Sequence, residues 1–124
     1  AQGRYFEMVS AQAGNAFHPD SLNNSALMAA RQRMVQAYGP QTYPAHVRAT
    51  AARPDRSHLL NGDRPTLVLA ASHDRVFAPE TLQAYARHLP GARVETVAHA
   101  GHLAPMEQPA AVAAALQAWV EGSA

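Results

Sequence analysis

A short run of successive apolar residues limits most narrowly what this chain can fold into. Residues 65–71 read Pro-Thr-Leu-Val-Leu-Ala-Ala, with apolar side chains at neighbouring rather than alternate positions. Such a strand is typical of a parallel sheet covered by helices on both faces. A helix beginning at Pro79, a second strand at 92–98 and a last helix beginning at Pro109 are expected to follow. The second half therefore predicts an α/β fold with two parallel strands, a crossover helix and a terminal helix.

The first sixty residues predict helices instead. The first expected helix ends near Gly14, the second runs from Ser21 or Asn24 to Gly39–Pro40, and the third covers 42–53. The residues Asn61–Gly62–Asp63 that follow favour a turn. We therefore expect a helical, lid-like cap segment at 1–60 and a core segment of strand, helix, strand and helix at 61–124.

The spacing of the glycines excludes several enzyme classes. No two of the seven glycines are closer than ten residues apart, so the chain has no GxGxxG, no P-loop and no GxSxG sequence. This argues against a Rossmann domain, a nucleotide kinase and a self-contained serine hydrolase. Two parallel strands also leave a sheet with bare edges, because parallel sheets normally contain more strands. We expect a second chain or self-association to complete the sheet.

Composition limits the kinds of partner and the cellular compartment that are expected. Ten arginines, no lysine and nine acidic residues give a net charge of +1, without a basic run. Nucleic-acid and membrane-surface proteins need a concentrated positive field, so neither partner is expected. The chain has no cysteine, which excludes disulfides and thiolate chemistry and is compatible with a reducing compartment. No signal-peptide pattern and no run of about 20 apolar residues is present. We therefore expect a cytoplasmic location.

Chemically useful side chains follow both expected strands. Asp74 comes after the first strand, and His99 and His102 come after the second. Ligands of open α/β sheets bind beyond the carboxyl ends of the strands, where an aspartate can orient a catalytic histidine. His99 and His102 could share a metal ion only on a helix, and Gly101 between them favours a loop. We therefore predict no metal site and no cofactor.

These segments resemble one known family. Residues 64–79 are similar to the penultimate core strand of α/β-hydrolases and the acid loop after it, and residues 90–109 resemble the last strand, the histidine loop and the entry to the final helix. The Gly101-His102 pair, followed by Glu107 and Pro109, is the most specific part. Residues 34–60 resemble the helical lid of small esterase- and lactonase-like members. The resemblance implies Asp74 as the triad acid and His102 as the general base.

The same resemblance implies a function. We expect a C-terminal segment of an α/β-hydrolase that cleaves small carboxylic esters or lactones by a Ser-His-Asp mechanism. It would supply the acid and base of a truncated, esterase-like catalytic triad and lack the serine nucleophile, which in this family lies on a GxSxG elbow earlier in the chain. The isolated chain is therefore expected to be inactive. The residues expected to line the substrate pocket are Val76, Phe77, Leu103, Met28 and Met34.

Two kinds of alternative remain at this point. A non-enzymatic binding or assembly module would use the exposed edge of the first strand to pair with a copy of itself or another protein. Within the enzyme class, a dehalogenase, an epoxide hydrolase and a C–C hydrolase differ in nucleophile and oxyanion residues that this sequence does not contain. The oligomeric state and the identity of the nucleophile would distinguish these alternatives.

Overall fold

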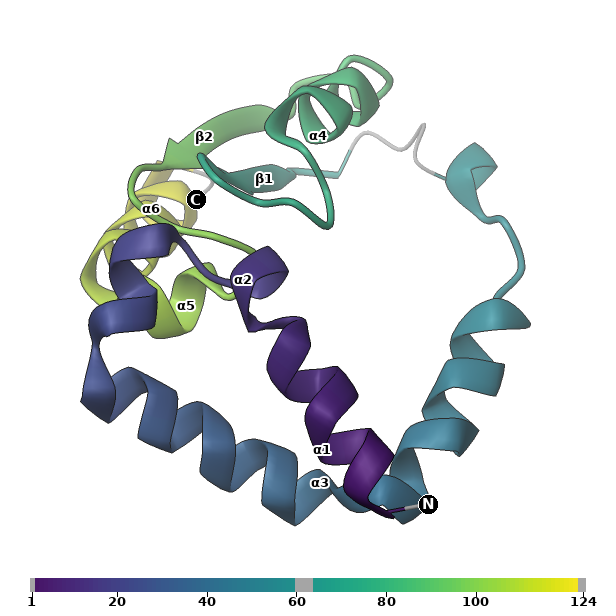
Figure 1. The fold of residues 1–124 in the computed structure, drawn as a ribbon. Helices are drawn as coiled ribbons and strands as arrows, with labels where there is room; N and C mark the ends of the chain where they lie inside the picture. The colour runs from purple at the N-terminus through teal and green to yellow at the C-terminus, as the bar shows by residue number, and fades with distance from the viewer. Residues whose placement is uncertain (1, 60–63, 123–124) are drawn as a thin grey trace.

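The computed structural model describes residues 2–59 and 64–122 of the chain. The turn expected at Asn61–Gly62–Asp63, and with it the expected boundary between residues 60 and 61, lies outside the described residues. A helical segment precedes this gap, and a segment of strands and helices follows it (Figure 1).

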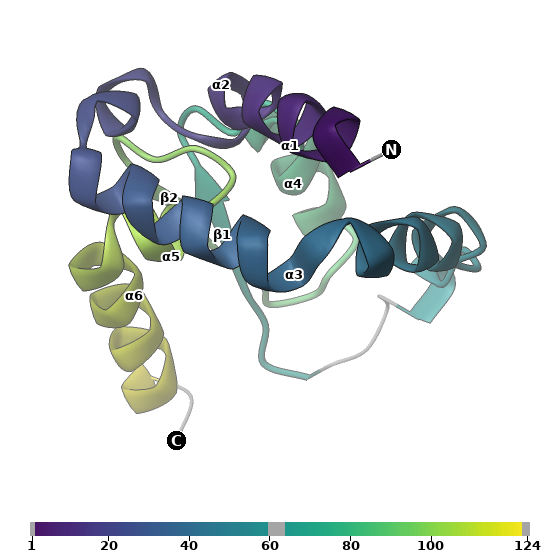
Figure 2. The same cartoon turned by 60° about the horizontal axis from the view of Figure 1, so that its bottom comes forward.

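Two parallel strands form the sheet of the described part of the chain. β1 (Leu67–Ala71) pairs along its whole length with β2 (Arg93–Val97). Helix α4 (Pro79–Ala86) connects the strands, and α6 (Pro109–Gly122) follows them, each opening on the proline expected to begin it. Both helices pack against both strands, and they lie on different sides of the strand pair (Figures 1 and 2). The predicted α/β order of strand, helix, strand and helix is confirmed.

The two strands differ in how they are suited to a sheet edge. β1 is entirely apolar, whereas β2 carries Arg93 and Glu95, whose Nε and Oε1 atoms lie 2.6 Å apart. Charged residues are typical of edge strands, where they discourage further pairing. Within the described residues β1 pairs with β2 alone, so its second edge is free. The sequence of β1 is therefore typical of an interior strand. A further strand paired with its free edge would place β1 in the interior of the sheet.

Burial of the sheet is less complete than the apolar run predicts. Ala70 and Ala71 at the end of β1 are buried with Val97 of β2, but the first three residues of β1 are only half-buried. A small cluster of Ala71, Val97 and Ala100, covered by Ala104 and Val112, forms the core beside α6. The core therefore lies at the carboxyl ends of the strands, where the loops meet.

The helical segment contains one long, sharply kinked element. The elements of the helical segment are α1 (Gln2–Ala11), α2 (Ala13–Ala16), a 3₁₀ turn (Pro19–Asn23), the kinked helix α3 (Ser25–Ala51) and a second 3₁₀ turn (Ser57–Leu59). The Asn24 side chain caps α3 by accepting a hydrogen bond from the Leu27 amide at 3.0 Å. Gly39 has φ 72° and ψ 163°, a conformation that favours glycine, and it interrupts the helix as expected. The predicted end of one helix at Gly39–Pro40 and the start of another agree with this break, although the second helical stretch begins at Pro40 rather than near residue 42 and ends at Ala51 rather than near residue 53.

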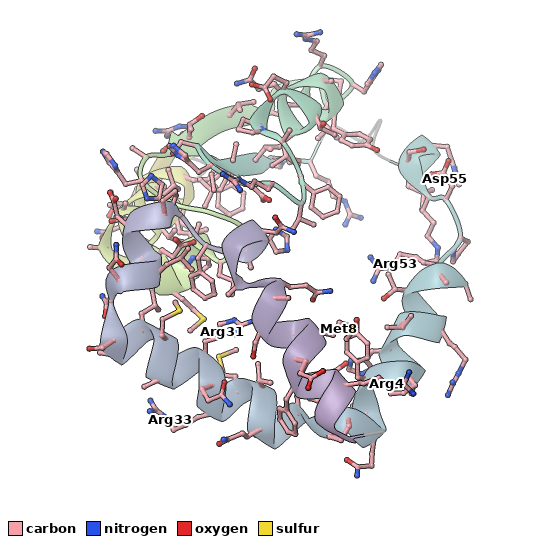
Figure 3. All side chains as sticks on the ribbon, in the orientation of Figure 1. Arg4, Met8, Arg31, Arg33, Arg53 and Asp55 are labelled. Carbon is pink, nitrogen blue, oxygen red and sulfur yellow. The ribbon has the colours of Figure 1, made fainter. Side chains whose placement is uncertain are left out.

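Tertiary contacts hold this segment together. Tyr5 is buried, and its hydroxyl donates to the Val35 carbonyl at 3.2 Å, which joins α1 to α3. Arg31 extends from α3 toward α1, donates to the Val9 carbonyl and lies over the Phe17 ring, 6.0 Å from its centroid (Figure 3). None of the helices in the described ranges is long and apolar enough to cross a membrane.

Candidate active site

The two residues expected to form the acid–base pair lie in contact. Asp74 stands in the loop between β1 and α4, and His102 in the loop after β2. His102 Nδ1 lies 3.0 Å from Asp74 Oδ2, a hydrogen-bond distance. The parallel strands bring this about, because their carboxyl ends meet at one edge of the sheet and direct both loops to the same place.

The Asp74 carboxylate is held by three donors. Its Oδ1 atom accepts hydrogen bonds from the backbone amides of Val76 at 2.8 Å and Phe77 at 2.9 Å, while Oδ2 faces the imidazole of His102. Burial by itself raises the pKa of this carboxyl. The bonds that it accepts, first from Phe77 and then from His102 and Val76, outweigh burial, so its pKa lies below the usual range. Asp74 is therefore ionised at neutral pH and serves as an acceptor only.

This depressed pKa predicts how stability responds to acid. A carboxyl whose folded pKa is below its unfolded value, about 3.9, stabilises the fold above that value, and the contribution is lost as pH falls through the folded pKa. The free energy of unfolding, measured by urea titration from about pH 2 to about pH 6, should fall more steeply with acid in the wild-type chain than in Asp74→Asn. Parallel pH profiles for the two proteins would contradict this assignment.

The orientation of His102 follows from its partner. Because an ionised carboxylate only accepts hydrogen bonds, the neutral tautomer that fits this contact has its proton on Nδ1 and its lone pair on Nε2. The His102 side chain is 37% exposed, whereas that of Asp74 is 8% exposed. The Phe77 ring lies beside the imidazole, with 5.9 Å between centroids. The imidazole is thus partly exposed, while the buried carboxylate of Asp74 contacts its Nδ1 atom.

Glu107 connects the His102 loop to the helical segment. Its Oε1 atom accepts a hydrogen bond from the Gly101 amide at 2.8 Å, and Oε2 accepts one from the His18 amide at 2.7 Å. The Leu103 amide adds a bond to the Ala16 carbonyl at 3.3 Å. The Glu107 carboxylate therefore links the backbone of His18 to that of Gly101, the residue before His102.

Gly101 is required by this close approach. A Cβ atom placed on it would lie 2.7 Å from the Phe17 carbonyl carbon and 2.8 Å from both the Ala16 oxygen and the His18 nitrogen. All three are backbone atoms, which cannot move aside as the end of a side chain can. Gly101 and Glu107 belong to the part of the sequence that resembles the α/β-hydrolases most specifically, but their contact with residues 16–18 exists only in the folded chain.

Comparison with known proteins identifies the fold family of the chain. A family model described as the alpha/beta hydrolase fold matches residues 8–109, most of the chain. The chain belongs to the α/β-hydrolase fold family. Its membership confirms the fold class and the resemblance noted for residues 64–79 and 90–109.

Two relatives of this α/β-hydrolase chain are esterases by name. A pimeloyl-[acyl-carrier protein] methyl ester esterase of Stenotrophomonas maltophilia is 35% identical over 92 residues, which cover 73% of this chain and 36% of that protein. A thermophilic esterase of Thermogutta terrifontis, solved with malate bound, superposes with a TM-score of 0.86 at 29% identity, covering 94% of this chain and 43% of that one. The chain thus spans well under half the length of either relative and is esterase-like.

The α/β-hydrolase nucleophile has no counterpart in this sequence. None of its serines lies in a GxSxG segment. Ser72, on the acid's own loop, has its hydroxyl 2.8 Å from Nδ1 of His73 rather than beside His102. Among the described residues, the serine on the loop of Asp74 is therefore directed to His73 and not to His102.

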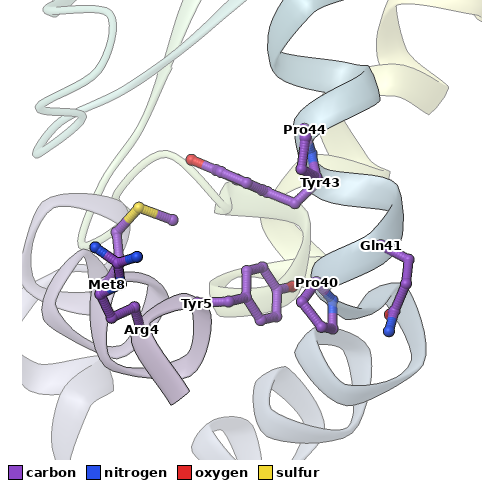
Figure 4. Close-up of a pocket in the computed structure, with 7 residues that line it drawn as sticks. All are labelled: Arg4, Tyr5, Met8, Pro40, Gln41, Tyr43 and Pro44. Atoms are coloured by element: carbon purple, nitrogen blue, oxygen red, sulfur yellow. The ribbon is translucent and has the colours of Figure 1, made fainter. Parts of the chain in front are cut away.

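The residues expected to line a substrate pocket stay a prediction. Val76 and Phe77 are each 51% exposed and flank Asp74, and Leu103 is half-buried next to His102. Met28 and Met34 lie on α3, half-buried and exposed respectively, and no observation links them to the base. A hollow of about 570 Å³ lies elsewhere, between α1 and the kink of α3 (Figure 4). Its lining is Arg4, Tyr5, Met8, Pro40, Gln41, Tyr43 and Pro44.

Proposed function

We propose that this chain supplies the acid and base of a serine-type hydrolase that cleaves small carboxylic esters or lactones. The observation that carries the proposal is the 3.0 Å contact between Asp74 and His102, which occupies Nδ1 of a partly exposed imidazole and leaves Nε2 outside the contact. The names of the two related esterases support an ester substrate over an alkyl halide or an epoxide. We further propose that the nucleophilic serine comes from residues outside this sequence, in the same polypeptide or in another.

The proposed mechanism follows from the orientation of the pair. Nε2 of His102 takes the proton of the serine hydroxyl as its oxygen attacks the ester carbonyl, and the imidazolium that forms is stabilised by Asp74. The same proton then passes to the leaving alkoxide. A water molecule, deprotonated in turn by His102, releases the acid from the acyl-enzyme. Val76, Phe77 and Leu103 are proposed to contact the substrate, because they adjoin the acid and the base.

Completion of the sheet is part of the proposal. A strand added at the free edge of β1 would bury its apolar face, and the family places the nucleophile elbow at the end of such a core strand. A second polypeptide, a longer form of this chain or a second copy are the possible sources of this strand. The cytoplasmic location and the cap role of the helical segment stay predictions of the sequence.

The first test determines what accompanies the chain and which serine reacts. Light scattering with intact-mass spectrometry gives the composition of the particle, and a fluorophosphonate probe labels an activated serine. We expect the 124-residue chain alone to be neither labelled nor hydrolytic, because a base without a nucleophile retains little of a triad's rate enhancement. In a longer polypeptide, or in a complex with a second one, we expect the labelled serine to lie outside these 124 residues.

Two results would overturn this proposal. One is labelling of a serine within the 124 residues, which would mean that the nucleophile had been misassigned. The other is that the probe labels no serine in this chain or in any longer polypeptide that contains it, and that each of them forms an oligomer. That result would favour the assembly module, in which the free edge of β1 pairs two copies.

A further inference from the structure

A cluster of metal-ligating side chains lies where the turn between α2 and α3 meets the loop after β2. His18 and Asp20 come from the turn between α2 and α3, and His99 comes from the loop after β2. One ligand atom from each residue lies within 4.8 Å of the other two. We propose that His18, Asp20 and His99 bind a divalent transition-metal ion of the zinc class.

The separations suit a single ion after a small adjustment. Two ligand atoms on a tetrahedral zinc ion lie about 3.3 Å apart when each metal–ligand distance is about 2.0–2.1 Å. His18 Nδ1 and Asp20 Oδ2 are already 3.6 Å apart. The rings of His18 and His99 have their centroids 5.6 Å apart at an interplanar angle of 66°. Closing the remaining gap requires movement of His99 and Asp20, which are both exposed and therefore free to turn.

His18 is the anchor of the proposed site. It is 6% exposed, and its ring packs edge-on against His73, with 4.2 Å between centroids. Its Nδ1 atom accepts a hydrogen bond from the Asp20 amide at 3.1 Å, so this nitrogen carries a lone pair that points toward Asp20. A metal ion would replace that single bond with coordination by the same lone pair.

The donor set indicates the kind of ion. Two imidazoles and one carboxylate suit zinc and its transition-metal neighbours, whereas magnesium and calcium prefer sites built from oxygen atoms alone. Three protein ligands with two exposed members leave a coordination position open to water. The sequence offered no such motif, because residues 18–20 and residue 99 are far apart along the chain.

Bound metal would join two parts of the molecule. His18 and Asp20 belong to the helical segment, and His99 precedes His102 by three residues in the loop that Glu107 already ties to His18. The ion would form a second link, beside Glu107, between the helical segment and the loop that carries His102. A ligand that binds only the folded state raises its stability, so the melting temperature should respond to the metal.

Metal binding can be tested without any assay of activity. The chain, freed of its purification tag and treated with chelator, is titrated with zinc chloride or magnesium chloride by calorimetry and by thermal melting. Zinc content after gel filtration is measured by mass spectrometry of the metal. We expect about one zinc ion per chain and a melting temperature raised by several degrees with zinc but not with magnesium.

Conservative variants identify the ligands. Asp20→Asn and His99→Gln should each weaken zinc binding by at least about tenfold and reduce the thermal shift. His88→Gln alters an exposed histidine outside the cluster and should bind zinc like the wild type. Both test variants change exposed side chains and leave the buried His18 intact, so the chain should fold. Wild-type affinity in the Asp20→Asn/His99→Gln double variant, or no zinc retained by the wild type, would overturn the proposal.

Discussion

Replacing His102 with alanine should lower kcat/KM for a small ester by roughly 10⁴–10⁶-fold in the assembly that contains the nucleophilic serine. Asp74 Oδ2 lies 3.0 Å from Nδ1 of His102, and under the proposed mechanism Nε2 of the same ring accepts the serine proton. Without it the serine stays protonated and attacks slowly. Hydrolysis of a chromogenic ester under conditions where the rate is proportional to substrate concentration measures this loss.

Two further variants separate chemistry from folding in this experiment. Asp74→Asn keeps an oxygen to accept the Val76 and Phe77 amides but removes the carboxylate that fixes the imidazole, and should cost roughly 10⁴-fold. His88→Ala removes an exposed histidine and should leave the rate unchanged. Undiminished activity in His102→Ala would exclude the proposed base. A loss in His88→Ala as large as in His102→Ala would show that the assay reports folding.

Replacing Gly101 with alanine should lower the free energy of unfolding by about 2–4 kcal/mol. The added Cβ would meet three backbone atoms of residues 16–18 at 2.7–2.8 Å, so the helical segment must move away from the loop. That movement would stretch the paired bonds from Glu107 to the amides of Gly101 and His18. Gly101 lacks a positive φ, so the expected effect comes from crowding and lost hydrogen bonds rather than from backbone strain.

A matched glycine variant provides the control. Gly14 also lies without a positive φ, and a Cβ added there meets no atom within 4 Å. Gly14→Ala should therefore be neutral or slightly stabilising, since alanine favours the helix of α2. Urea titration of both variants measures the difference. Equal stability of Gly101→Ala and Gly14→Ala would mean that the loop and residues 16–18 are not in the close contact described.

Local sequence signals were sufficient for most elements of the core segment. The apolar run at 65–71 predicted β1, and Pro79 and Pro109 marked the helix starts, because these preferences depend on the nearest neighbours in the chain. The short helix α5 (Ala104–Glu107) was not predicted, since its four residues carry too little periodicity to be recognised. The start of the second helical stretch at Pro40, rather than near residue 42, was also missed, because glycine and proline signal a break without fixing where the next helix begins.

The contact between Asp74 and His102 could be predicted from the sequence, but the surroundings of the two residues could not. Asp74 and His102 follow two strands, and their meeting is a general consequence of parallel pairing. The amides that depress the pKa of Asp74 belong to a turn whose geometry no pattern specified. The two bonds of Glu107 and the crowding at Gly101 depend on residues 16–18, which lie more than eighty residues earlier in the chain.

The sequence by itself determined the order of strands and helices, the absence of a GxSxG segment, and that Asp74 and His102 follow two neighbouring strands. Each of these depends on neighbouring residues or on a pattern that repeats across a family. Only the tertiary structure decided that residues 16–18 close against Gly101, that Glu107 holds them there, and that His18, Asp20 and His99 converge. These contacts join segments distant along the chain, and packing of the whole fold selects them rather than any local preference.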